Sequence, residues 1–381
     1  MTSLLGTWMR GGTSKCWLFN AVDLDPLLRS DDLDAVLISA FGSEDPRQLD
    51  GVGGGTSTTS KAAIVRRSHL DDVDIDYLFA QVAIGHRAVE WGSNCGNCAT
   101  AIGLYALQTG MVAADAEVTT VRMRNQNTGA RLSARIATPG GRIPADGAAA
   151  VPGTNALGVP VSLTFADVAR SMEELLPTGR VTDVLEVGGH RYHGTLVNAG
   201  APAALFRAAD FDLTGSEGND HLTERLPVLI ELRRKAALAM GLARPGDPVR
   251  HAVPKVGIVA AAADYVATDG TRVSGSAYDV AVRMVSMLAP HPAIGLTSAV
   301  AVAAAAAVRG SVVAEHLSAH AGKTLRLGTA AGVIPTTVTT SDKGLPRDVS
   351  LHRAARRIAR AELFLAESAP AYAMSATRPN H

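Results

Sequence analysis

The sequence predicts an α+β protein with two domains, and three observations support this prediction. The chain has 381 residues, which is enough to bury two hydrophobic cores. Many segments between glycine-containing turns are short and apolar or alternating, as expected of strands. Two helices rich in small residues, predicted at 97–110 and 297–310, each follow a predicted strand, one in each half of the chain.

The overall composition indicates a soluble globular protein, with 47% hydrophobic and 19% charged residues. Lys+Arg and Asp+Glu both total 36, so the zero net charge argues against a nucleic-acid or membrane-surface partner. The longest apolar run, 299–308, is too short to span a bilayer. Three cysteines are too few for a disulfide framework, and no signal-peptide pattern opens the chain. We therefore expect a cytoplasmic protein without a membrane partner.

The first motif is a predicted hairpin. Strands at 4–9 and 16–19 flank the turn 10–15, which carries an arginine, two hydroxyls including that of Ser14, and a lysine. These groups suit a carboxylate, although an ordinary solvated turn fits the pattern equally well. A helix is expected next at 30–41, with its N-cap at one of its first two residues.

The loop 50–61 contains the most unusual pattern of the chain. Three consecutive glycines leave the backbone open to close approach by a ligand, and an unbroken hydroxyl run follows them. Lys61 then precedes 62–65, which reads as a buried strand. Burial of a lysine favours its neutral form, which can act as a base. The alternative is a glycine-rich turn with a solvated lysine, and the pattern is not that of a P-loop.

Cys95 and Cys98 lie where a loop gives way to the helix predicted from residue 97. At a helix N-terminus the macrodipole and free amides stabilise a thiolate or a bound carboxylate. A redox pair would normally open a thioredoxin-like unit, and zinc needs more ligands than this region offers, whereas buried structural thiols stay open as an alternative. No metal-ligand cluster or nucleotide fingerprint is present, so neither a metal nor a cofactor is predicted.

The remaining elements follow from periodicity and capping. Thr223 is a candidate N-cap for a helix at 224–240, Thr297 or Ser298 is one for the helix at 297–310, and 349–363 is predicted as a terminal helix. The helix at 297–310 offers a second N-terminus for an anion, although an ordinary buried helix fits as well. Further strands are expected at 76–82, 118–137 (two strands), 159–165, 183–189, 253–259, 278–287, 324–327 and 333–340.

Three motifs together resemble the PrpF family: residues 9–15, the loop ending at Lys61, and 94–97. The resemblance runs essentially end to end. It implies a diaminopimelate-epimerase-like fold, with two similar domains that each wrap a curled, mostly antiparallel sheet around a central helix. The expected first domain is 1–183 completed by 345–381, the second is 184–344, and the active site should lie between them.

The resemblance also implies a function. Family members shift a double bond along small tricarboxylates such as 2-methylaconitate, aconitate or 4-oxalomesaconate without a cofactor. Lys61 and Cys95 occupy the positions of the family's catalytic pair. The expected partner is a small tricarboxylate or dicarboxylate, and the sequence leaves a homodimer open. Candidate substrate-binding residues are Ser14, Gly55, Thr56, Ser57, Gly96, Asn97, Arg283, Thr297 and Ser298.

The sequence departs from the family pattern at three places. Cys16 stands where glycine is usual, Cys98 where serine or leucine is frequent, and 328–332 where relatives often carry Gly-His-Pro-Ser-Gly. These departures bear on substrate identity more than on reaction type. A two-base epimerase remains an alternative, but Ser298 stands where a second thiol would be wanted. A non-catalytic protein that binds a tricarboxylate for a partner enzyme is the other alternative.

Overall fold

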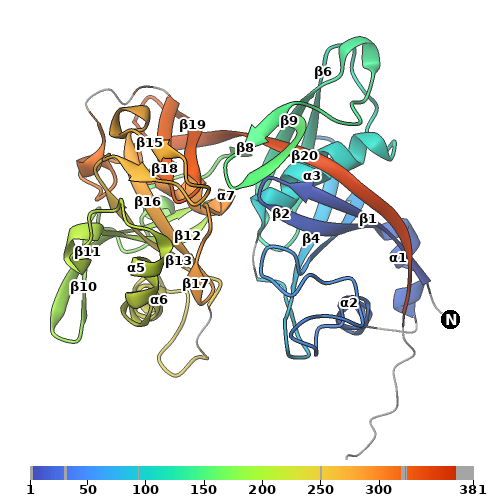
Figure 1. Cartoon of the computed structure of the whole chain (residues 1–381). Coiled ribbons are helices and arrows are strands. Elements are labelled where there is room, and N and C mark those ends of the chain that lie inside the picture. The colour runs from blue at the N-terminus through green and yellow to red at the C-terminus, as the bar shows by residue number, and fades with distance from the viewer. Residues whose placement is uncertain are drawn as a thin grey trace, which may run out of the picture.

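The computed structural model describes residues 3–29, 32–92, 94–248, 251–318, 322 and 324–365. Over these residues the chain forms two lobes, and the long strand β20 runs between them (Figure 1). The helices are α1 (Ala21–Leu24), α2 (Leu33–Phe41), α3 (Gly96–Gln108), α4 (Met172–Leu175), α5 (Asn219–Glu224), α6 (Leu226–Ala239) and α7 (Leu296–Ala306).

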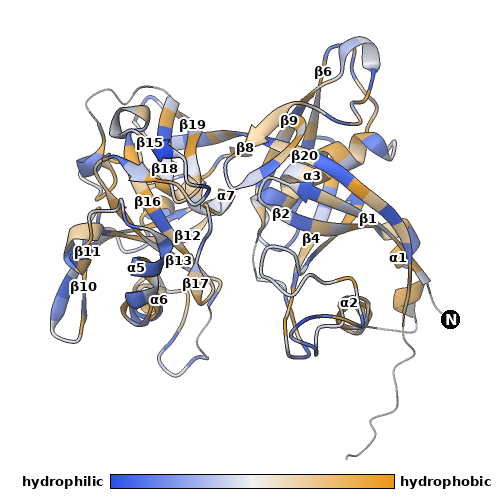
Figure 2. Ribbon diagram, viewed as in Figure 1, coloured by the Kyte–Doolittle hydropathy of each residue, from blue (hydrophilic) through white to orange (hydrophobic). Residues whose placement is uncertain are grey.

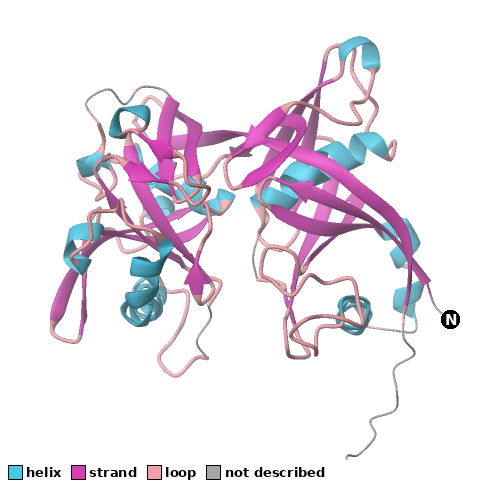
Figure 3. Ribbon diagram, in the orientation of Figure 1, coloured by secondary structure: helices cyan, strands magenta, loops and turns pink. Residues whose placement is uncertain are grey.

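Strands make up most of the regular structure (Figure 3). Those of the first half are β1 (Ser3–Gly11), β2 (Ser14–Asn20), β3 (Lys61–Arg67), β4 (Ile75–Val82), β5 (Val89–Glu90), β6 (Val118–Asn125), β7 (Arg131–Ala137), β8 (Ala149–Val151) and β9 (Thr154–Ala166). Those of the second half are β10 (Asp183–Val187), β11 (His190–Ala199), β12 (Ala201–Arg207), β13 (Lys255–Ala260), β14 (Tyr265–Val266), β15 (Arg272–Val273), β16 (Val280–Ser286), β17 (Ala289–Pro290), β18 (Thr324–Thr329), β19 (Gly332–Thr340) and β20 (Pro346–Phe364).

The first half is a closed ring of strands around α3. The strands pair in the order β1–β2–β3–β4–β6–β7–β9–β20, and β20 returns to pair with β1. Every residue of α3 except Gln108 is buried, because the helix packs against strands on several sides. Its small residues allow this close approach: a Cβ at Gly103 would lie 2.4 Å from that of Ala134.

The second half repeats these pairings in the same order. β11–β12 is antiparallel, β12–β13 parallel, β13–β16 antiparallel, β16–β18 parallel, and β18–β19 and β19–β20 antiparallel. The corresponding first-half pairs, from β1–β2 to β7–β9, have the same orientations. The buried helix α7 lies between β17 and β18 in the chain, as α3 lies between β5 and β6. The predicted α+β class is confirmed.

The predicted terminal helix is wrong, because its residues form the strand β20. Its alanines and arginines favour a helix locally. However, Val349, Leu351, Arg353 and Ala355 are all buried at every second position, which suits a strand. Hydrophilic and hydrophobic residues accordingly interchange along the ribbon in Figure 2. Pairing with β1, β9 and β19 supplies hydrogen bonds along almost its whole length and outweighs the local preference.

The structure also differs from the prediction at three helix N-caps. Thr223 lies inside α5, and a break at Arg225 separates that helix from α6, whose first turn carries Pro227. Gly295 is the N-cap of α7, so Thr297 and Ser298 lie within its first turn, and the helix ends at Ala306 rather than 310. The N-cap of α2 is Asp32, whereas the two predicted cap residues 30 and 31 lie outside the described residues.

The other predicted strands are confirmed, with bounds shifted by a few residues. β13 begins directly after Pro254 and lies between β12 and β16. The strand after residue 345 joins the first-half sheet, while the domain boundaries themselves stay a prediction. Among the described residues no helix is long and apolar enough to cross a membrane.

Candidate active site

The hairpin turn between β1 and β2 rests on the N-terminus of α3. The Asn97 side-chain amide donates to Thr13 Oγ1 at 3.1 Å and to Ser14 Oγ at 3.3 Å. A Cβ at Gly11 would lie 1.9 Å from the Asn97 carbonyl oxygen, so only glycine allows this approach. Two of the motifs from the sequence are therefore in direct contact.

The glycine loop joins the same assembly through its backbone. The Lys15 amide donates to the Thr58 carbonyl at 2.9 Å. Gly55 adopts a left-handed φ of 63° and donates its amide to Gln48 Oε1. Thr56 is exposed and bonds to the Thr59 hydroxyl at 2.7 Å, while Ser57 beside it is half-buried. The loop thus places its hydroxyls next to the hairpin turn and leads directly into β3.

Lys61 begins β3 and is only 9% exposed. Its amine donates to Gln81 Oε1 at 2.5 Å and lies 5.1 Å from the centre of the Phe79 ring. Gln81 is held in turn by donating to the Ser60 carbonyl at 2.8 Å. The Lys61 amine is therefore fixed by a neutral amide, not by a carboxylate, and its charge acts on Cys95.

Cys95 is the N-cap of α3 and is half-buried. Its pKa lies well above the ordinary value, first because its thiol hydrogen-bonds to Cys98 and second because of burial, while the Lys61 charge opposes the rise. Of the two species expected at this helix end, the thiolate is therefore disfavoured. Cys98 is buried and its thiol contacts Cys16 in turn, so the three cysteines form one chain of free thiols.

The N-termini of α3 and α7 meet. A Cβ at Gly96 would lie 2.5 Å from that of Leu296, the first residue of α7. Thr297 and Ser298 are both buried in that first turn. Neither N-cap makes a side-chain capping bond, and first-turn amides have no partner within their own helix. Two partial positive charges are thus directed at one region.

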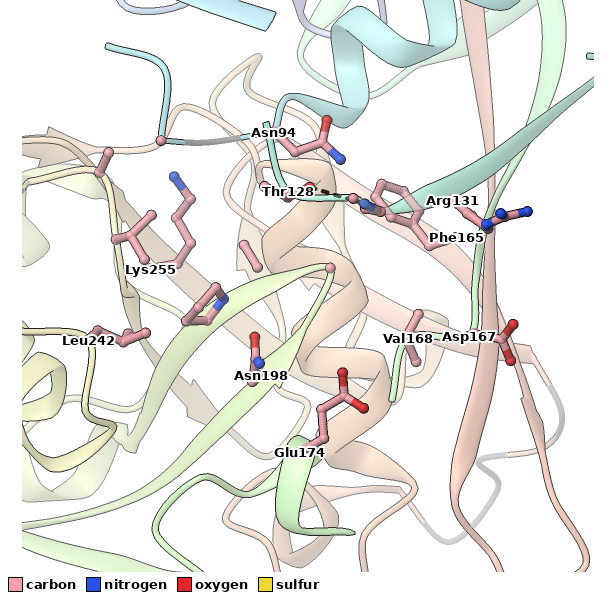
Figure 4. A pocket seen from close by; sticks show the side chains of 18 of the residues that line it. Asn94, Thr128, Arg131, Phe165, Asp167, Val168, Glu174, Asn198, Leu242 and Lys255 are labelled. Atoms are coloured by element: carbon pink, nitrogen blue, oxygen red, sulfur yellow. Dashed lines mark hydrogen bonds between the residues drawn. The ribbon is translucent and has the colours of Figure 1, made fainter. Parts of the chain in front are cut away.

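A cleft of about 1140 Å³ opens next to this junction, with walls from both halves. Asn94, which precedes Cys95, and Phe165 come from the first half, and Asn198 and Lys255 come from the second (Figure 4). Lys61 and Cys95 are not on the walls of the cleft. The electrostatic interaction of Lys255 with both nevertheless places the cleft beside the pair.

Three cationic or basic residues at this place were missed from the sequence: Lys255, His291 and Arg353. Burial and the Lys61 charge lower the pKa of Lys255 to about 8. Burial, with the charges of Lys61, Lys255 and Arg353, lowers the pKa of His291 to about 4. Burial lowers the pKa of Arg353 to about 10. Among the described residues no carboxylate forms an ion pair with Lys61, Lys255 or Arg353.

Two of these three residues could have been found from the sequence. Lys255 opens a buried strand after a loop, as Lys61 does, and His291 precedes the second small-residue helix. Arg353 carried no such signal, because it lay in the segment predicted as a helix. It lies beside the hairpin turn, where its Cδ would be 3.8 Å from a Cβ at Gly12.

Arg283 is not brought together with the other candidates. It is buried on β16, where its guanidinium donates to the backbone carbonyls of Glu217, Val282 and Gly328. It also stacks over the Tyr265 ring at 4.8 Å. These contacts belong to the core of the second half. As for metals, no group of three or more His, Cys, Asp or Glu side chains gathers as a ligand set within the described part of the chain.

The chain matches a family model along nearly its whole length. The PrpF protein model covers residues 1–366. The chain belongs to the PrpF family. A 2-methyl-aconitate isomerase of Shewanella oneidensis is 35% identical over 348 residues, which cover 86% of this chain and 87% of the relative. A (4E)-oxalomesaconate Delta-isomerase of a Novosphingobium species is 36% identical over 366 residues, covering 94% and 96%.

Two solved structures resemble the chain to different degrees. The crystal structure of a methylitaconate-delta-isomerase superposes with a TM-score of 0.80 at 31% identity and covers 96% of each chain. A hydroxyproline epimerase from Agrobacterium vitis superposes with a TM-score of 0.54 at 12% identity, covering 95% of this PrpF-family chain and 92% of the epimerase. This second likeness concerns the fold alone.

Proposed function

We propose that this chain is a cofactor-independent allylic isomerase, which moves a double bond by a 1,3-proton shift in a small tricarboxylate. The curated relatives are isomerases by name, and their similarity extends over most of the chain, so the protein is an isomerase of small carboxylic acids. Candidate substrates are 2-methylaconitate, aconitate and 4-oxalomesaconate. The diaminopimelate-epimerase-like arrangement of two similar domains belongs to this proposal and is supported by the repeated strand pairings.

One observation carries the substrate class: cations gather at the site, and none of them forms an ion pair with a carboxylate among the described residues. Two helix N-termini meet at Gly96 and Leu296. Lys61, Lys255 and Arg353 all act on His291, and none of the three is paired with a carboxylate in the described part of the chain. Such a site is stabilised by a ligand that brings several negative charges of its own. A tricarboxylate meets this requirement.

The residues divide between proton transfer and binding. Lys61 is the proposed base: its amine is buried and held by a neutral amide, and in its unprotonated form it can take a proton from the carbon beside the double bond. Cys95 is a protonated thiol and thus an acid that can return a proton to the other end of the allylic system. The alternative, in which Lys61 alone carries the proton from one carbon of the allylic system to the other, stays open.

The binding groups surround this pair. The amides of Gly96 and Asn97 and those of Thr297 and Ser298 are suited to carboxylates. The hydroxyls of Ser14, Thr56 and Ser57 add hydrogen bonds, and the left-handed φ of Gly55 sets the turn from which the last two project. When the proton leaves, charge spreads onto a carboxylate as a dienolate, and donors held in place stabilise it. An accessory binding role does not require both a buried base and an adjacent acid.

A substrate screen tests the proposal. Purified protein in deuterated water is mixed with cis- and trans-aconitate, 2-methylaconitate, 4-oxalomesaconate and 3-methylitaconate, and proton NMR follows each. We expect double-bond migration with deuterium uptake in at least one acid, retained after dialysis against EDTA. Loss of activity that one metal restores, or a complete lack of turnover across the panel, would contradict the proposal. Stereochemical inversion of a proline derivative without isomerisation would favour an epimerase.

A further inference from the structure

Lys255 occupies the place in the second half that Lys61 occupies in the first. Each is the first residue of a strand that pairs in parallel with the preceding hairpin strand, β3 with β2 and β13 with β12. Each of these strands then pairs antiparallel with the next long strand, β4 or β16. The following sequences also agree: Lys61 leads into Ala-Ala-Ile-Val and Lys255 into Val-Gly-Ile-Val.

The strand register shows which way Lys255 faces. Gly257 pairs with Met284, and a Cβ on Gly257 would touch the Met284 sulfur, so both face the core that contains α7. Lys255 is two residues before Gly257 and lies on the same face. His291 donates its amide to the Met284 carbonyl and extends this row. Lys255 and His291 thus approach the N-terminus of α7 from one sheet, as Lys61 approaches α3 from the other.

The two lysines differ in their partners. Gln81 stands opposite Lys61 and accepts a hydrogen bond from its amine. In the second half the register places Ser286 beside Lys255, and serine is too short to take this role. No other described residue holds the Lys255 amine, which lines the cleft (Figure 4). Burial and the Lys61 charge lower the pKa of Lys255, and the acid that opposes this effect is Glu90.

We propose that Lys255 binds the substrate carboxylate onto which charge moves when Lys61 removes the proton. The inference rests on the proposed function, because it requires a carboxylate in the cleft. A cation on the wall of the cleft whose charge acts on the base, and that forms no ion pair with a carboxylate among the described residues, is suited to this charge. Lys255 is then a catalytic residue that binds more tightly as the dienolate forms.

His291 complements Lys255 as a neutral neighbour. Its Nδ1 accepts the Ala293 amide at 3.0 Å, which leaves the ring proton on Nε2. The charged groups that act on it are Lys61, Lys255 and Arg353, and all three oppose its protonation. The ring therefore adds no charge to the site at neutral pH, and its Nε2–H is free to donate. Lys255 remains the only second-half lysine with a charge directed at the substrate among the described residues that line the cleft.

Steady-state kinetics with Lys255→Met, Lys255→Arg and Lys343→Met test the inference. The exposed Lys343 lies in the turn before β20 and serves as the matched control. We expect Lys255→Met to lower kcat/KM about 100-fold, with kcat reduced as well as KM raised. Lys255→Arg should restore part of the loss, and Lys343→Met should match the wild type. Wild-type kcat and KM in Lys255→Met would overturn the inference, even though the enzyme still isomerises its substrate.

A binding measurement separates this inference from the proposed function. Propane-1,2,3-tricarboxylate has no double bond and serves as an unreactive probe for calorimetry. Wild type should bind it less tightly as the pH rises through about 8, because Lys255 loses its charge there. Lys255→Arg should keep its affinity to higher pH, and identical profiles would overturn the inference. If wild type neither binds the probe nor isomerises any acid in the panel, the proposed function itself fails.

Discussion

The N-termini of α3 and α7 correspond in the two halves, yet their caps differ in chemistry. Cys95 caps α3 and carries a thiol, whereas Gly295 caps α7 and carries no side chain. The hairpin turn of β1 and β2 packs on α3, where a Cβ at Gly11 would lie 1.9 Å from the Asn97 carbonyl. The turn between β11 and β12 packs on α7, where a Cβ at Gly200 would lie 2.8 Å from that of Val300. The backbone scaffold is thus repeated, but the reactive group is not.

This difference indicates which steps of the proposed reaction each half carries out. A two-base epimerase needs an acid or base on each face of the reacting carbon, and Gly295 cannot supply one. The first half keeps a lysine fixed by Gln81 and an acid at Cys95. The second half keeps a helix N-terminus and Lys255, which are suited to binding carboxylates. We infer that proton transfer belongs to one half and charge stabilisation to the other.

The largest expected effect comes from removing the base of the first half. Lys61→Ala should abolish exchange of the allylic hydrogen with deuterated water, because the amine proposed to accept that hydrogen as a proton is gone. Proton NMR of substrate in deuterated water measures the exchange, and circular dichroism checks the fold. Exchange near the wild-type rate in a folded variant would show that the halves do not divide as proposed.

Cys95→Ser tests whether the thiol is the acid. We expect kcat to fall by about 10² to 10⁴, since a hydroxyl at the same position is a much weaker acid. The hydrogen removed by Lys61 should still exchange with solvent, because the first step is intact. The matched measurements are turnover and exchange on the same sample. A variant that isomerises at full rate would assign both proton transfers to Lys61.

Gly96→Ala tests the junction between the helices. The added methyl would lie 2.5 Å from Leu296 Cβ, so the helices must shift, and we expect a loss of about 1–3 kcal/mol in unfolding free energy. Gly295→Ala is the counterpart, where the nearest atom is the Ser298 hydroxyl at 3.5 Å, and it should change stability little. Denaturant titration compares the two. Equal costs would mean that the tight approach at Gly96 is absent in solution.

Local patterns predicted the elements that carry the site, but not all of its residues. The glycine loop before Lys61 and the small residues after Cys95 each have a local cause that is visible in sequence. Lys255 was missed because the face of β13 on which it lies follows from pairing with β12 and β16, which the local sequence does not show. Arg283 was misplaced for the same reason: the face of β16 on which it lies is set by tertiary packing. For β20, sheet pairing overrode helix propensity.

The smallest expected effect on activity is that of Cys98→Ala. This variant tests whether Cys98 sets the pKa of Cys95, the N-cap that distinguishes α3 from α7. Cys98 is buried, so we expect a cost of about 1 kcal/mol from lost packing and near-normal turnover. Its contact is the main reason that the pKa of Cys95 is raised, so removing it should lower that pKa. At a fixed pH more Cys95 is then thiolate, and iodoacetamide should alkylate it faster. Lys61→Ala should have the opposite effect, because the Lys61 charge favours the thiolate. Mass spectrometry of the labelled peptide across pH measures both, and slower labelling in Cys98→Ala would contradict the thiol contact.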